Sequence, residues 1–239
     1  MGLDYHEKHY SEKAAARRRI NLGLAAKGVE FADIDAAYID EAAVIGAGTR
    51  IGACVTIEGG TAIGENCIIG QNSMIKDSRI GDGAEILHSV VLGSEVGERA
   101  SIGPFAYLRP GSRVGSGAKV GDFVEVKNSV IGNNSKASHL TYIGDSDIGD
   151  DVNLGCGVVF VNYDGKDKHR STVGDGAFIG CNANIVSPVN IGEGAYVAAG
   201  TTVTSDVPGG SLAVGRAKQR SIDGWVAKRG LLKGRLKKK

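Results

Sequence analysis

The sequence has 239 residues, a net charge of +1 and 42% hydrophobic residues, which are the values of an ordinary globular chain. This charge gives no reason to expect nucleic acid as a partner, and no apolar run is long enough to span a membrane. The four cysteines form no CxxC pair and no signal peptide precedes them, so we expect reduced thiols and a cytoplasmic protein.

The first expected element is a helix over residues 4–27. The stretch AAARRRINLGLAAKG consists mostly of good helix formers, and Gly28 stands where a helix C-cap is expected. We expect residues 1–38, which contain this helix, to cap the repeat that follows, because an open sheet edge invites aggregation. A second interpretation, a connector to another domain, stays open.

A hexapeptide repeat fills residues 39–207, with a branched aliphatic residue at nearly every sixth position. Two unbroken series are Ile39, Ile45, Ile51, Ile57, Ile63, Ile69 and Ile75, and Val173, Ile179, Ile185, Ile191, Val197 and Val203. This period is typical of an all-β parallel β-helix, in which three short strands make one coil and every sixth side chain points inward. Three hexads per coil predict about nine coils, and a strand spacing of about 4.8 Å predicts a prism roughly 40 Å long.

The repeat is irregular at two kinds of place. Steps of five residues, as from Ile75 to Ile80, indicate tightened corners, after which Leu92 is expected to continue the inward series. After Phe160 the stretch VNYDGKDKHRS carries no inward aliphatic residue until Val173. We therefore expect a loop at residues 161–172, and long loops on rigid scaffolds often carry function.

Several motifs between about residues 109 and 225 resemble one enzyme family. The stretches LRPGSRVG, GDFVEVKNSVIG, SKASHLTYIGD, NLGCGVVFVNYDGKDKH and AAGTTVTSDVP follow one another in order. They are similar to the acetyltransferase domain of the bifunctional N-acetylglucosamine-1-phosphate uridyltransferase and glucosamine-1-phosphate acetyltransferase. The resemblance implies a left-handed coil, which the periodicity leaves open, and a homotrimer with sites between subunits.

The resemblance also implies a reaction. Acetyl-CoA would acetylate the amine of glucosamine 1-phosphate, giving N-acetylglucosamine 1-phosphate for UDP-N-acetylglucosamine and cell-wall precursor synthesis. The sequence has no glycine-rich nucleotide loop and no alternating βα pattern, so we expect this chain to form no UDP-sugar from UTP.

Acetyl transfer to an amine needs a base, donors for the oxyanion and cations for a sugar phosphate. By the resemblance the base is His139, although a lone histidine in a wall is ordinarily structural. The resemblance places the phosphate on Arg109 and Lys127. The remaining substrate residues that it implies are Tyr142 and Asn153, which shape the sugar pocket, and Lys168, which reaches the substrate of a neighbouring subunit.

The acetyl-CoA residues that the resemblance implies are Cys156, Asn162, Tyr163, Cys181, Ala199 and Arg216. The family commonly has Ala where Cys156 stands and Ser where Cys181 stands, which a contact through backbone amides tolerates. Residues 208–239 are expected to form a solvated basic tail. In a second interpretation Arg216 lies near the phosphates of coenzyme A and Trp225 packs the tail onto the prism.

Three alternatives belong to other classes. Some β-helices hold zinc with three histidines, but only His88, His139 and His169 lie in the coil region and none form a close pair, so we expect no metal. A purely structural or binding β-helix would need no polar loop at 161–172. An acetyltransferase for another amino sugar, a nucleotide sugar, a sugar hydroxyl or serine stays open, because the hexads cannot separate these acceptors, whereas Arg109 and Lys127 favour a phosphorylated sugar.

Overall fold

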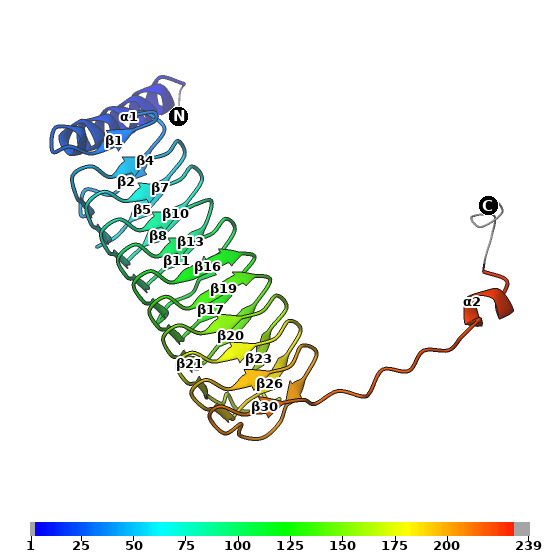
Figure 1. Ribbon diagram of the computed structural model, residues 1–239. Helices are drawn as coiled ribbons and strands as arrows, with labels where there is room; N and C mark the ends of the chain where they lie inside the picture. Colours follow the sequence, from blue (N-terminus) through cyan, green and yellow to red (C-terminus); the bar gives the residue numbers. More distant parts are fainter. Residues whose placement is uncertain (1–2, 232–239) are drawn as a thin grey trace.

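Three parallel sheets form a three-sided prism in the computed structural model, which describes residues 3–231 (Figure 1). Each strand pairs with the strands three places before and after it in chain order. One strand from each sheet therefore makes one coil, and sheets of eleven, ten and nine strands give about ten coils. The predicted fold class, a left-handed parallel β-helix of hexapeptide type, is confirmed.

The sheets are named A, B and C in the order in which the chain enters them. Sheet A contains β1 (Glu30–Phe31), β4 (Arg50–Ile51), β7 (Ile68–Ile69), β10 (Glu85–Ile86), β13 (Ser101–Ile102), β16 (Lys119–Asp122), β19 (Lys136–His139), β22 (Asn153–Leu154), β25 (Phe178–Ile179), β28 (Tyr196–Val197) and β30 (Leu212–Ala213). Sheet B contains β2 (Tyr38–Ile39), β5 (Thr56–Glu58), β8 (Met74–Lys76), β11 (Val90–Leu92), β14 (Tyr107–Leu108), β17 (Glu125–Lys127), β20 (Tyr142–Gly144), β23 (Val159–Val161), β26 (Asn184–Val186) and β29 (Thr202–Val203). Sheet C contains β3 (Val44–Ile45), β6 (Ala62–Ile63), β9 (Arg79–Ile80), β12 (Glu95–Val96), β15 (Arg113–Val114), β18 (Val130–Ile131), β21 (Ser146–Ile148), β24 (Ser171–Val173) and β27 (Asn190–Ile191).

The core is a stack of aliphatic side chains that point inward from successive coils. Most strands have one exposed and one buried residue, as in β2, β3 and β4, because side chains alternate between the two faces of a strand. Ile57 and Ile75 are completely buried on neighbouring strands of sheet B, and Phe160 is the largest buried side chain. Each buried isoleucine contributes about 1.5–3 kcal/mol relative to an exposed one, so stability accumulates coil by coil.

The tightened corners turn through single residues in the left-handed backbone region. Asp77, Asn128 and Asp145 have φ values of 47°, 47° and 49°, and the short polar side chains of Asn and Asp tolerate this region better than most others. The expectation for Leu92 is wrong: Leu92 is half-buried and Val91 takes the inward position. The corner before Val91 is also one residue short, which moves the inward phase back by one.

The helix α1 (Leu3–Ala25) covers the N-terminal end of the prism, as predicted (Figure 1). Leu24 is buried in the core, and Asn21 Nδ2 donates hydrogen bonds to the carbonyl oxygens of Ile34 (2.7 Å) and Ala37 (3.0 Å). The expected C-cap is also present, since Gly28 has a φ of 95°. These contacts tie the helix to the first coil.

The predicted division of the chain is into residues 1–38, 39–207 and 208–239, with the β-helix in 39–207. The observed prism extends beyond this range at both ends. Strand β1 pairs with β4 before that range, and β30 pairs with β28 after it. The division itself stays a prediction.

After β30 the chain leaves the far end of the prism and reaches the short helix α2 (Trp225–Lys228) (Figure 1). The second interpretation, in which Trp225 packs the tail onto the prism, is wrong, because α2 has no buried residue and Trp225 is 43% exposed. The guanidinium of Arg229 lies 5.3 Å from the ring centre of Trp225, so this aromatic face has a local cationic partner.

Candidate functional site

The histidine predicted as the base lies at the corner between sheets A and B. His139 ends β19, and Asp122 takes the equivalent place at the end of β16 on the preceding coil. The His139 Nδ1 atom lies 2.5 Å from Asp122 Oδ1, and the two side chains are 56% and 36% exposed. The hydrogen bond from His139 holds the pKa of Asp122 below its ordinary value. The corner thus presents an imidazole that is held by a carboxylate and open to solvent.

The same corner continues with three of the predicted acetyl-CoA residues. Because Ala137 pairs with Leu154, Leu154 with Ile179 and Ile179 with Val197, the positions two residues further on stack in successive coils. These positions are His139, Cys156, Cys181 and Ala199, which we call the corner row. Arg216 lies next to it, since its Cδ is 3.7 Å from where a Cβ of Gly200 would stand.

The backbone of the corner row fits a ligand that accepts hydrogen bonds. Within the described chain the amide groups of Cys156, Cys181 and Ala199 donate to no acceptor. Glycines keep the coils close beside them: a Cβ on Gly155 would lie 2.6 Å from the Cys181 nitrogen, and one on Gly180 would lie 2.5 Å from the Ala199 nitrogen. Unpaired amides on a rigid wall can bind carbonyl or phosphate oxygens without rearrangement.

A second group of predicted residues surrounds Asp145 on sheet B and its following corner. Lys127 Nζ lies 2.8 Å from Asp145 Oδ2, which also accepts from Asn162 Nδ2 at 2.5 Å. Asp145 Oδ1 accepts from Asn128 Nδ2 at 2.7 Å. Burial alone would raise the pKa of Asp145, but the hydrogen bonds from Lys127, Asn128 and Asn162 outweigh it and lower this pKa. The hydrogen bond to Asp145 raises the pKa of Lys127, so this pair is charged at neutral pH.

Two more predicted substrate residues join this group. Tyr142 Oη lies 2.6 Å, and Asn162 Nδ2 2.8 Å, from where a Cβ of Gly144 would stand, so both side chains lie over this glycine. Arg109 occupies the place equivalent to Lys127 one coil earlier, because Leu108 pairs with Val126. Its Nη1 donates to Glu125 Oε1 at 2.9 Å, which raises the pKa of Arg109. One donor of Arg109 is engaged, and the guanidinium has others that face no acceptor in the described chain.

The loop predicted at residues 161–172 is present but shorter: it runs over residues 162–170 between β23 and β24, at the corner between sheets B and C. Asp164 Oδ1 accepts from the backbone nitrogens of Lys166 (2.8 Å) and Asp167 (2.7 Å), and its Oδ2 lies 2.7 Å from His169 Nε2. These contacts, the His169 hydrogen bond first, hold the pKa of Asp164 far below its ordinary value. Lys168 is exposed on this loop.

The structure does not bring all predicted residues of one chain together. Asn162 and Tyr163 follow sheet B, whereas the other predicted acetyl-CoA residues follow sheet A on the corner row. The side chain of Asn162 is 6% exposed and turned toward Asp145. Asn153 lies on the outer face of sheet A, between Lys136 and Phe178. The predicted set therefore occupies two corners and two faces of the prism.

Two residues of the site escaped the sequence analysis. Asp122 and Asp145 belong to no predicted set, yet each binds a predicted residue one coil away. The sequence spacing could have indicated both pairs. Asp122 precedes His139 by 17 residues and Asp145 precedes Asn162 by 17 residues, and 17 residues is the length of one coil with one tightened corner. Polar residues at a coil-length spacing are therefore candidates for direct pairs.

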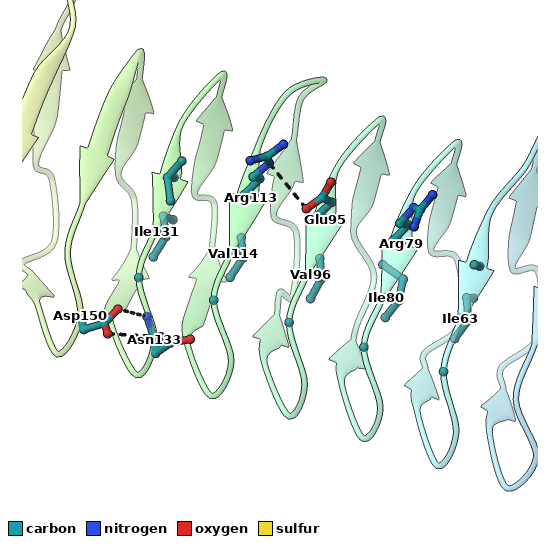
Figure 2. A pocket seen from close by; sticks show the side chains of 17 residues that line it. Ile63, Arg79, Ile80, Glu95, Val96, Arg113, Val114, Ile131, Asn133 and Asp150 are labelled. Carbon is teal, nitrogen blue, oxygen red and sulfur yellow. Dashed lines mark hydrogen bonds and ion pairs between the residues drawn. The ribbon is translucent and has the colours of Figure 1, made fainter.

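A further hollow of the described surface lies elsewhere. It is a groove of about 670 Å³ along sheet C, and no predicted site residue lines it. Figure 2 shows two contacts within it, while Arg79 is drawn with no partner: Arg113 Nε lies 3.5 Å from Glu95 Oε2, and Asn133 Nδ2 donates to Asp150 Oδ2 at 3.2 Å. No cluster of three or more residues suited to hold a metal ion occurs among the described residues.

The comparisons with known proteins agree with the motifs. The family model described as bacterial transferase hexapeptide (six repeats) matches residues 42–77 and 170–205. A bifunctional protein GlmU of Caldicellulosiruptor saccharolyticus is 50% identical over 229 residues, which cover 96% of this chain and 50% of that protein. One of Clostridium botulinum is 47% identical over 233 residues, which cover 98% of this chain and 51% of that protein.

A solved structure supports the fold alone. The UDP-N-acetylglucosamine acyltransferase of Francisella novicida has a TM-score of 0.51 at 20% identity, covering 82% of this chain and 72% of that chain. Within residues 3–231, no helix is both long and apolar enough to cross a membrane. The chain spans about half the length of the curated relatives it matches. The predicted resemblance is confirmed: this chain is a hexapeptide-repeat β-helix protein, and nearly its whole length matches about half of the length of the bifunctional GlmU proteins.

Proposed function

We propose that this chain transfers the acetyl group of acetyl-CoA to the amine of glucosamine 1-phosphate. The observation that carries the proposal is the corner row, where a solvent-open histidine stands at one end of a line of unpaired backbone amides. The proposal also rests on similarity, because this chain is about 50% identical to half of the length of a bifunctional GlmU protein. A cytoplasmic location belongs to the proposal, in keeping with the scattered cysteines.

The residues divide the chemistry between them. The Nε2 atom of His139 takes a proton from the attacking amine as the nitrogen–carbon bond forms. The thioester carbonyl oxygen gains negative charge in that step, and an amide of the corner row stabilises it. The carbon–sulfur bond then breaks and coenzyme A leaves as the thiol, with the proton supplied from the histidinium. Arg216 lies where it can bind a phosphate of the same cosubstrate.

The sugar phosphate binds on sheet B in this proposal. Arg109 and Lys127 are neighbours on adjacent coils, and each retains donors beyond its ion pair with Glu125 or Asp145. Tyr142 begins the next strand of sheet B, three residues after His139, so the chain passes directly from the corner row to this sheet. A phosphorylated amino sugar therefore has a cationic site on the sheet that follows the base in the chain.

We further propose a homotrimer with the site between subunits. In one chain Tyr163 and Lys168 lie on the corner after sheet B, while Cys181 and Ala199 lie on the corner after sheet A. A second subunit can place its exposed loop against the corner row of the first, which would complete the predicted cosubstrate set. The arrangement needs a closed ring, because each chain offers one loop and one corner row.

One assay tests the activity and its acceptor. Thiol release from acetyl-CoA is followed with glucosamine 1-phosphate, with glucosamine and with serine as acceptors. We expect turnover with the phosphorylated sugar and at least about tenfold less with glucosamine, since losing a charge-assisted contact costs about 1.5–3 kcal/mol. Equal rates with glucosamine would contradict the phosphate site, and no thiol release with any acceptor would contradict acetyl transfer.

A complementation experiment tests the shared site. We expect His139→Ala and Lys168→Ala chains to be nearly inactive alone, and the two are unfolded and refolded together to form mixed trimers. Some of these contain one intact site made from two different chains, so part of the activity should return. Mixed trimers that stay inactive would show that both residues serve the same chain.

A further inference from the structure

The contact between Asp122 and His139 is set by the scaffold. Both residues end paired strands, and the backbone nitrogen of Leu140 donates to the Asp122 carbonyl oxygen at 2.9 Å. The side chains project from equivalent places of adjacent coils and meet at 2.5 Å between Oδ1 and Nδ1. The hydrogen bond therefore forms without any change in the backbone of either strand.

The partner on Nδ1 decides what the other ring nitrogen can do. A carboxylate only accepts hydrogen bonds, so the Nδ1 of His139 must carry a proton in this contact. A neutral imidazole has one protonated nitrogen, which leaves the lone pair on Nε2. The lowered pKa of Asp122, caused first by this hydrogen bond, keeps the carboxyl group ionised at neutral pH.

The other two histidines of the coil region differ in this respect. His88 Nε2 lies 3.2 Å from Gln71 Nε2, and His169 Nε2 lies 2.7 Å from Asp164 Oδ2. Within residues 3–231, the Nε2 of His139 contacts no hydrogen-bond partner. Of the three, His139 alone has its Nδ1 held by a carboxylate and its Nε2 open.

We infer that Asp122 is a positioning residue, which holds His139 in the tautomer with a proton on Nδ1 and directs the basic Nε2 toward the acceptor amine. This inference rests on the proposed acetyl transfer and adds a residue to it. Asp122 contacts neither substrate; it acts through the histidine, as a carboxylate orients the imidazole of a catalytic triad.

The test compares two substitutions of Asp122, one that keeps the size of the side chain and one that removes it. Asp122→Asn keeps the size of the side chain, but its amide can donate to Nδ1 and so moves the proton to Nε2, which is the unproductive tautomer. Asp122→Ala removes the partner and lets water solvate Nδ1, so both tautomers remain accessible. We therefore expect kcat to fall by about 10- to 100-fold for Asp122→Asn and less for Asp122→Ala. The buried triad loses about 10⁴-fold, and the smaller loss expected here reflects the exposure of this pair to water.

The KM values for both substrates should stay within about twofold of the parent, because no contact with substrate is removed. Glu95→Gln on sheet C is the matched control, since Glu95 is also a carboxylate paired with the next coil, through Arg113. This control should leave kcat unchanged. A merely structural role would produce the opposite order, with the isosteric Asn variant milder than Ala.

Nitrogen-15 NMR of labelled histidine reads the tautomer without any turnover. The His139 signals are assigned by their loss in His139→Ala, and we expect a protonated Nδ1 and an unprotonated Nε2 in the neutral parent, reversed in Asp122→Asn. A proton on Nε2 in the parent, an Asn variant with kcat within twofold of the parent, or a larger loss for Ala than for Asn would each overturn the inference. If the parent itself transfers no acetyl group, the proposed function fails, while the NMR result still decides the tautomer.

Discussion

Replacing Asp145 by Asn tests whether the buried pair with Lys127 stabilises the prism. Asn tolerates the left-handed backbone, so the φ of 49° at this position introduces no new strain. The substitution keeps the shape of the side chain but replaces one oxygen by an amide group and removes the charge. Its effect therefore comes from the hydrogen bonds and the ion pair alone.

The magnitude follows from the three donors around the carboxylate. Oδ2 accepts from Lys127 and Asn162, and Oδ1 accepts from Asn128. An Asn side chain has one acceptor oxygen, so at least one of these donors must face an amide group. The Lys127 and Asp145 side chains are only 16% and 10% exposed, and breaking a charge-assisted hydrogen bond in such a place costs about 2–4 kcal/mol.

Urea unfolding at equal protein concentration measures the loss, with the slope compared to confirm that both chains unfold alike. Glu95→Gln again serves as the control, because its exposed pair with Arg113 is worth at most about 1 kcal/mol. We expect the Asn variant to lose clearly more than the control at pH 7. Equal losses in the two variants would refute the assignment of stability to this buried pair.

The pH dependence gives an independent check. The pKa of Asp145 is lowered by folding, so its stabilisation is present above the ordinary pKa near 3.8 and is lost as the pH falls through the lower folded value. The pKa of Lys127 is raised, so its share is lost only as the pH rises above its ordinary 10.5. The difference between parent and variant should be constant from about pH 5 to 9 and shrink below about pH 4.

Three further outcomes are expected. His139→Ala should stay folded in the assembly state of the parent, still bind acetyl-CoA and lose about 10²- to 10⁴-fold in acetyl transfer, with partial recovery at higher pH; a parent-like rate at neutral pH would exclude His139 as the base. Lys127→Ala should raise the KM for the sugar phosphate and leave that for acetyl-CoA unchanged, as steady-state kinetics with each substrate varied can show. Gly46→Ala should destabilise the prism by about 1–3 kcal/mol, because its Cβ would lie 2.6 Å from the backbone of Gly64, whereas Gly60→Ala, with no atom within 4 Å, should not; urea midpoints that agree for the two would contradict this packing.

The direction of most side chains in the repeat could be predicted from the sequence alone, with Leu92 as an exception. A six-residue period places the equivalent residue inward in successive strands, so most of the buried set, the parallel β-helix and the capping helix followed from the positions of isoleucine, glycine and the first charged segment, whereas the left-handed coil came from the resemblance. The loop after Phe160 was equally predictable, because a polar stretch without an inward residue cannot remain in the wall. These features depend on local spacing, and local spacing is what a sequence displays.

Which residues touch across coils was decided only by the tertiary structure. A lateral neighbour depends on the number of residues in one whole coil, and each tightened corner changes that number by one. Leu92 shows the effect, since one more short corner moved the inward position to Val91. The pairs of Asp122 with His139 and of Asp145 with Lys127 depend on the same count. The period determines which way a side chain points, whereas the stacking of coils determines what it meets.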